Sequence, residues 1–140
     1  MKELDTIASR LRGATTLAGL LDAGFDAFEA IRLVARAGED LAPGFLAAFI
    51  TTAGTAVEGR NALNDAPSLP PATGPPPAPA VSLTVDAGQI ADELAALAAL
   101  LAQCLAEAGA RAAGEGDRAA CQHATCAAAD IHRLLAPGRG

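Results

Sequence analysis

The last third of the chain holds the residues best suited to metal or thiol chemistry. The segment CQHATCAAADIH places two cysteines, two histidines and an aspartate within twelve residues. In a helix that turns by about 100° per residue, His123, Cys126 and Asp130 fall within roughly 60° of one another. An imidazole, a thiolate and a carboxylate are ligands of zinc or copper, and Cys104 or a partner chain could supply a fourth. Cys121 points toward the apolar side of the same helix.

The spacing of these residues matches no established metal motif. No CxxC pair, HExxH sequence or second ligand cluster accompanies them, and alanine-rich helices use cysteine as a small apolar residue. We therefore predict no metal site and no cofactor. His123, Cys126 and Asp130 are kept as candidate ligands of an alternative in which the last helix senses a metal or a thiol oxidant. His132 is interpreted as a residue of the last helical turn, where the helix dipole favours a cation.

A second group of titratable residues lies near the N-terminus. Asp22, Asp26 and Glu29 share one helical face, and paired carboxylates can perform acid/base catalysis. However, Arg32 and Arg36 follow at spacings of three and four residues, which is typical of a solvated face with salt bridges. The sequence contains no phosphate-binding loop and no nucleophile paired with an identifiable general base. The sequence therefore predicts a protein that is not an enzyme.

The elements that position these residues are predicted to be helices. Alanine and leucine dominate, while tyrosine and tryptophan are absent, which favours helix over sheet. Apolar residues recur at spacings of three and four along most of the chain. We expect a short leading helix and four main helices, over 2–12, 14–37, 43–64, 86–113 and 118–135. The predicted fold is all-α, a four-helix bundle built from two antiparallel hairpins.

A proline-rich segment divides the chain into two halves. SLPPATGPPPAPA favours an extended conformation and reads as a spacer, or alternatively as a docking peptide. The predicted units are an N-terminal hairpin (1–66), a linker (67–80) and a C-terminal hairpin (81–140) that share one core. Segments 46–63 and 118–135 align at an offset of 72, so an old duplication and a chance likeness of alanine-rich helices both remain open.

The apolar side chains are larger in the first half. All four phenylalanines lie there, whereas the second half fills its stripe with alanine, leucine and cysteine, which bury less area. The second half should therefore pack on the first, or on another subunit. We expect Phe25, Phe28 and Phe49 in the core with Leu94, Leu97 and Leu101 packed toward them. In the helix expected over 43–64, the buried stripe should be Leu46, Phe49, Ile50, Ala53, Val57 and Leu63.

Composition narrows the function. The net charge of −6 argues against nucleic acid as a partner. Three cysteines, an odd number, argue against a disulfide framework and favour the cytoplasm. The uncharged stretches 41–57 and 94–106 fall short of the ~20 apolar residues of a membrane span, and the charged N-terminus does not resemble a signal peptide.

The resulting prediction is an acidic, non-catalytic helical module for protein–protein interaction or scaffolding. Its expected partner is a protein, most simply a second copy of itself in a homo-oligomer. The alternatives are a small metal- or thiol-sensing protein that uses the last helix, and an accessory subunit of an enzyme complex.

Overall fold

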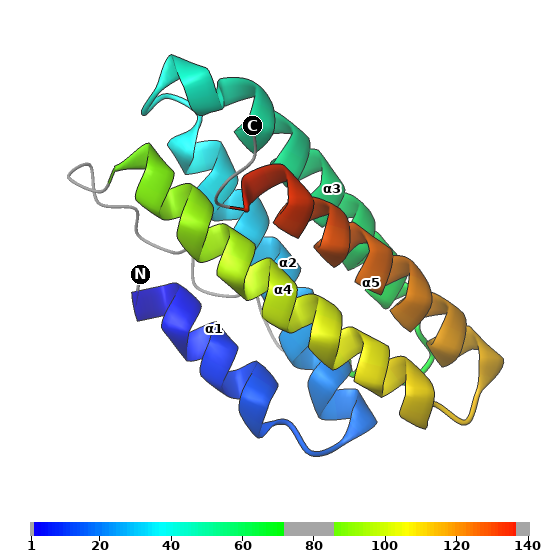
Figure 1. Cartoon of the computed structure of the whole chain (residues 1–140). Coiled ribbons are helices and arrows are strands. Elements are labelled where there is room, and N and C mark those ends of the chain that lie inside the picture. Colours follow the sequence, from blue (N-terminus) through cyan, green and yellow to red (C-terminus); the bar gives the residue numbers. More distant parts are fainter. Residues whose placement is uncertain (1, 72–85, 137–140) are drawn as a thin grey trace.

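The computed structural model describes residues 2–71 and 86–136, and helices account for most of them (Figure 1). In chain order the elements are α1 (Lys2–Gly13), α2 (Leu17–Gly38), the short 3-10 helix η1 (Pro43–Phe45), α3 (Leu46–Asn64), α4 (Ala87–Arg111) and α5 (Glu115–Leu135). No strand occurs in the described residues. The all-α prediction is therefore confirmed.

The helix ends follow local sequence signals closely. The Thr16 hydroxyl accepts a hydrogen bond from the Gly19 amide at 3.0 Å and caps α2, and Pro43 lies in the first turn of η1. Asp86 precedes α4 with an extended backbone, as expected of an N-cap, but its side chain makes no capping hydrogen bond. α5 begins at Glu115, so the turn before it is shorter than the expected 114–117.

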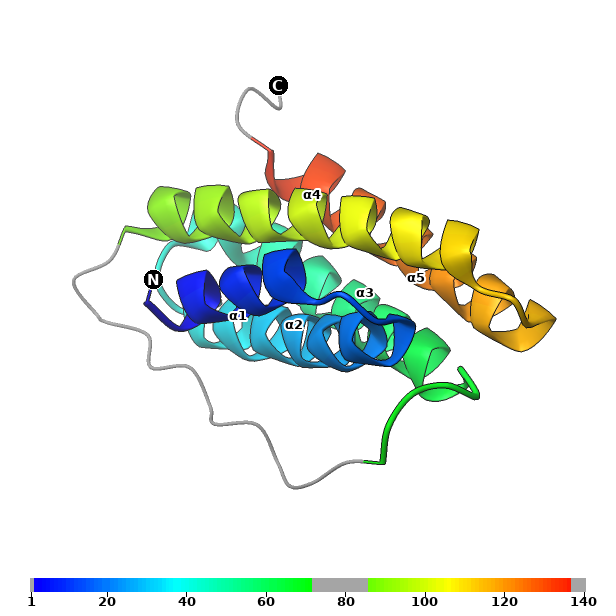
Figure 2. The same cartoon turned by 90° about the horizontal axis from the view of Figure 1, so that it is seen from below.

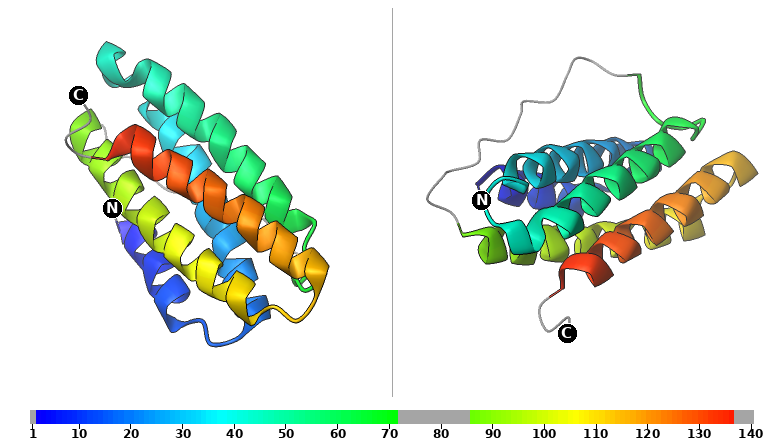
Figure 3. Two further views of the ribbon diagram at one scale, coloured as in Figure 1. Left: turned by 45° about the vertical axis from the view of Figure 1, so that its right-hand side comes forward. Right: turned by 90° about the horizontal axis from the view of Figure 1, so that it is seen from above.

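The helices α2 to α5 pack together as one group, and α1 flanks this group (Figures 2 and 3). α2 packs against α3 and α4, and α5 also packs against α3 and α4, so that each long helix has two neighbours. α1 lies along α2 and α4. The expected leading helix and the four main helices are all found, but the predicted core of four helices is corrected to five, because α1 buries Leu4 and Leu11 in the same cluster.

The core contains side chains from all five helices in one continuous cluster. Phe28 and Phe49 are fully buried, as predicted, whereas Phe25 is only partly buried. Leu94, Leu97 and Leu101 of α4 are buried in the same cluster. The two halves of the sequence therefore contribute to one hydrophobic interior.

α3 buries a different face from the one the sequence suggested. Leu46 and Ile50 are exposed and Val57 is half-buried, although all three were expected in the core. The buried face consists instead mainly of small residues between the two large anchors Phe49 and Leu63; its smaller members are Thr52, Ala53, Ala56, Gly59 and Ala62. Apolar residues surround α3 on most sides, so their periodicity does not select a face. Close packing against Phe28 of α2 does select one, since only glycine at position 59 leaves room for that ring.

α4 agrees closely with the helix expected over 86–113 and extends well beyond the uncharged stretch 94–106. With 25 residues it is long and apolar enough to cross a membrane by length and composition alone. Its leucine-bearing face is, however, buried against the other helices, and the core helix of a soluble protein meets the same criterion. This feature is weak evidence for a membrane span.

The chain leaves α3 along a segment that is fixed to α5. The buried Asp117 carboxylate accepts hydrogen bonds from the Ser68 amide at 2.9 Å and the Ser68 hydroxyl at 2.6 Å. A Cβ added at Gly116 would lie 3.1 Å from the Pro67 ring, so these two residues are in close contact. Of the predicted linker, only 67–71 belong to the described residues, and the prediction that it forms a surface strap lies otherwise outside them.

Candidate functional site

The structure leaves the three candidate metal ligands on the outer surface of α5. His123, Cys126 and Asp130 are all exposed. Cys126 lines a groove between α5 and α4, whereas Asp130 lines a hollow between α5 and α3 and forms an ion pair with Arg133. Cys126 and Asp130 therefore line different hollows on two sides of α5. In the described part of the chain, no group of three or more His, Cys, Asp or Glu side chains is placed to hold a metal ion.

The three thiols are in different environments, and all are free. Burial raises the pKa of the Cys104 thiol, and nearby Glu107 raises it further, against a smaller opposing effect of Arg12. Burial and the Asp117 carboxylate likewise raise the pKa of Cys121. A raised pKa keeps both thiols protonated and poorly nucleophilic. Cys126 is the exposed one.

His132 belongs to the helix packing rather than to a surface cluster. It lies in the last turn of α5, as predicted, and it is half-buried. Its Nδ1 atom is 3.1 Å from the Ala95 carbonyl oxygen of α4. This hydrogen bond links α5 to α4.

The acidic face of α2 forms ion pairs, as its spacing indicated, but some of the partners come from other helices. Arg10 of α1 contacts Asp26 at 2.7 Å and Asp22 at 3.2 Å. These carboxylates therefore hold α1 against α2. They do not form an isolated pair suited to acid/base catalysis.

Glu29 lies at the centre of a second ion-pair network. It contacts Arg32 of its own helix at 3.1 Å and Arg60 of α3 at 2.5 Å. Burial alone would raise the pKa of Glu29, but the hydrogen bonds and charges of the two arginines outweigh it and hold the pKa below its usual value. The carboxylate stays ionised and ties α2 to α3.

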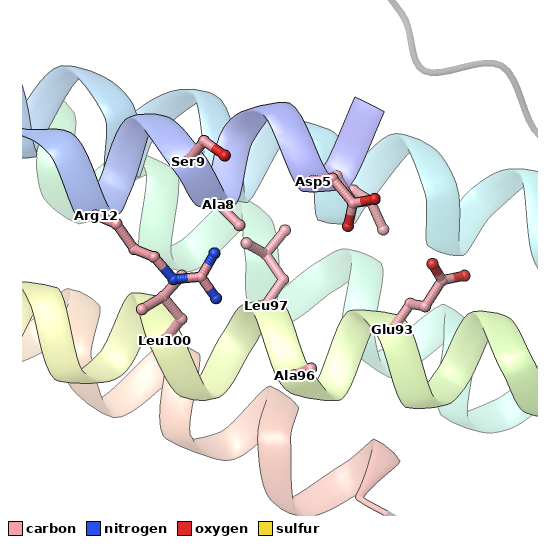
Figure 4. Close-up of a pocket in the computed structure, with 9 residues that line it drawn as sticks. Asp5, Ala8, Ser9, Arg12, Glu93, Ala96, Leu97 and Leu100 are labelled. Carbon is pink, nitrogen blue, oxygen red and sulfur yellow. The ribbon is translucent and has the colours of Figure 1, made fainter. Parts of the chain in front are cut away.

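A groove between α1 and α4 combines charged and apolar side chains on the described surface (Figure 4). Its volume is about 260 Å³. Leu97 of α4 lies at its middle, Leu100 and Arg12 lie near one end, and Asp5 and Glu93 lie near the other. Ser9 stands on the α1 side, with its hydroxyl at the rim.

The electrostatics of this groove differ from those of α2. Neither Arg12 nor Asp5 forms an ion pair or a side-chain hydrogen bond with another described residue. Both are exposed, while Leu97 below them is buried. Arg12 and Leu100 also line an adjoining hollow of about 250 Å³ that reaches Arg111. The α1–α4 groove can therefore offer a cation, an anion and an apolar surface to one ligand.

A second surface of note is the outer face of α3. Leu46 is 41% exposed and Ile50 is 52% exposed, and they are the large apolar side chains exposed in the described residues. They are four residues apart, so they lie next to each other on the helix. No charged residue occurs between Asp40 and Glu58. This part of α3 is therefore an apolar, uncharged surface.

The sequence reasoning did not identify either of these surfaces. Asp5, Ser9 and Arg12 recur at four- and three-residue spacing on a helix whose other face is apolar, and this pattern could have marked one polar side of α1. Nothing in the sequence indicated that α4 would face that side. The exposed position of Leu46 and Ile50 follows from how α3 packs, not from its composition.

Comparison with known proteins adds no family to this description. No protein-family model, no curated protein sequence and no solved structure gives a significant match to the chain. The class defined by fold and surface is thus an all-helical protein with one shared core. Its function has to be argued from its own surfaces.

Proposed function

We propose that the protein is a non-catalytic helical module for protein–protein interaction that self-associates through the outer face of α3. The observation that carries this proposal is the exposure of Leu46 and Ile50 side by side on an uncharged surface. Adjacent exposed apolar side chains are typical of a contact surface when they lie within a wider uncharged area. The proposed fold detail is that α2 to α5 form a four-helix bundle of two hairpins, to which α1 is added.

Charge favours a second copy as the partner. Each chain carries −6, so two copies repel one another unless the surfaces that meet are neutral. The α3 face satisfies this condition, since it contains no charged residue before Glu58. A two-fold contact would place Ile50 of one copy against the same region of the other, which is the usual geometry of a homodimer. The Ala/Leu face of the second half is buried in the core of the chain. It could form the contact between two copies only if the core opened.

The remaining parts of the proposal follow from composition. We infer a cytoplasmic location, supported by three free cysteines. We infer no nucleic-acid partner, supported by the acidic charge. We also propose no membrane partner and no enzymatic activity of the chain itself.

The test is the mass of the protein in solution as a function of concentration, measured by sedimentation velocity. The wild-type protein should shift from monomer toward dimer as its concentration rises, and Ile50→Glu should remain monomeric. Ala99→Glu is the matched control, because it adds the same charge at an exposed position of α4 and should dimerise like the wild type. A wild-type protein that is monomeric up to millimolar concentration would exclude this proposal, and so would equal loss of dimer in both variants.

A thiol-sensing role is the second candidate function, and the exposure of Cys126 favours it. Titration of the native protein should show one rapidly reacting thiol, and Cys126→Ser should abolish that reaction. Reaction of Cys104 or Cys121 at a similar rate would argue against a specific sensor. The metal-sensing alternative gains no support from the described residues.

A further inference from the structure

We propose that the groove between α1 and α4 binds a short extended peptide of about three residues, with free termini and apolar side chains. Its carboxylate would be held by Arg12 and its ammonium group by Asp5, across the apolar surface of Leu97 and Leu100 (Figure 4). This inference concerns a different surface from the α3 contact and does not depend on it.

The charges at the two ends of the groove are opposite and available. Arg12 and Asp5 have no ion-pair partner among the described residues, whereas Arg10 of the same helix pairs with Asp26 of α2. A guanidinium group binds a carboxylate with two parallel hydrogen bonds, which makes Arg12 suited to a peptide C-terminus. Glu93 lines the same end as Asp5.

The separation of the two charges sets the length of the ligand. Asp5 and Arg12 are seven residues apart on α1, which corresponds to roughly 10 Å along the helix axis. An extended chain advances by about 3.3 to 3.6 Å per residue, so three residues span about the same distance. A free amino acid is too short to reach both ends at once.

The floor between the charges determines the character of the ligand. Leu97 is 4% exposed, Leu100 is half-buried, and the alanines Ala8 and Ala96 flank them. A small or aliphatic side chain at the centre of the peptide would cover this floor. The volume of about 260 Å³ has no room for a folded partner domain, but it accommodates a chain of this size.

The experiment is calorimetric titration of the full-length protein with the peptide Ala-Leu-Ala and two blocked forms of it. The peptide with free ends should bind, and N-acetylation or C-amidation should each weaken binding by about tenfold, the effect of losing one charge-assisted contact near a surface. Arg12→Gln should weaken the free peptide by a similar factor and should abolish the effect of C-amidation. Asp5→Asn should do the same for N-acetylation.

Matched controls separate recognition from changes in net charge. Lys2→Gln removes one positive charge from an exposed position of α1 that does not line the groove, and it should bind the peptide like the wild type. Circular dichroism should show that Arg12→Gln and Asp5→Asn keep wild-type helicity. Absence of binding at millimolar peptide would overturn the proposal. If the acetylated peptide bound as tightly as the peptide with free ends, the proposal would also be overturned. The groove would then bind any amphipathic carboxylate, such as a protein C-terminus, without recognising the ammonium group.

Discussion

Gly59 provides the sharpest test of the packing between α2 and α3. A Cβ added at this position would lie 2.3 Å, 2.4 Å and 2.8 Å from three ring atoms of Phe28. Ordinary contact begins at 3.4 Å, so the ring or the helix would have to move by about 1 Å. Phe28 is fully buried, so its ring cannot move into solvent without opening the core. Gly59→Ala should therefore destabilise the protein.

The magnitude follows from two opposing effects. Alanine gains about 1 kcal/mol over glycine inside a helix, whereas overpacking a core costs about 1 to 3 kcal/mol, and a displacement of a fully buried ring belongs at the upper end. The net loss should be about 2 kcal/mol, or a decrease in Tm of roughly 6 to 10 °C for a chain of this size. Gly54→Ala is the matched control on the same helix, because no atom lies within 4 Å of its added Cβ. It should stabilise the protein by up to ~1 kcal/mol.

The assay is urea unfolding followed by far-UV circular dichroism, since the chain has no tryptophan or tyrosine to report by fluorescence. A double-mutant cycle with Phe28→Leu isolates the contact, and the cost of Gly59→Ala should fall by at least ~1 kcal/mol in that background. If Gly59→Ala is as stable as Gly54→Ala, the close approach of α2 and α3 is not as described and this reasoning is refuted.

Three further predictions concern the core, the ion pairs and the two halves of the chain. The Thr52 hydroxyl is buried without a hydrogen-bond partner among the described residues. Thr52→Val should therefore raise the free energy of unfolding by about 1 kcal/mol in the same urea assay. A decrease in the free energy of unfolding would show that the hydroxyl has a hydrogen-bond partner. Because the folded-state pKa of Glu29 lies below its ordinary value, its ion pairs should stabilise the protein fully above the ordinary pKa, and this stability should be lost as the pH falls through the lower folded-state pKa. Thermal melts of Glu29→Gln should accordingly show less acid destabilisation than those of the wild type; an identical acid limb would contradict this. A fragment 81–140 should be poorly helical alone and gain helicity when mixed with fragment 1–66, whereas cooperative folding of 81–140 as a monomer would show that the shared core is dispensable.

The local signals in the sequence determined much of the secondary structure. Thr16 and Pro43 mark helix starts because a side-chain acceptor and a fixed backbone angle act within one turn, without help from the rest of the fold. The buried face of α4 was also predictable, since Ile90, Leu94 and Leu101 form an uninterrupted stripe of large side chains. These features depend on neighbours in the chain.

Only the tertiary structure decided which surfaces could serve a function. α3 is apolar on most sides, and the choice between Leu46 and Gly59 as the buried residue depends on the ring of Phe28 from another helix. In the same way, Arg10 pairs across helices while Arg12, two residues later, faces α4 and remains available. The periodicity of one helix predicts which of its residues share a side. Which other helix faces that side depends on contacts between residues far apart in the chain. The sequence pattern of a single helix contains no information about these contacts.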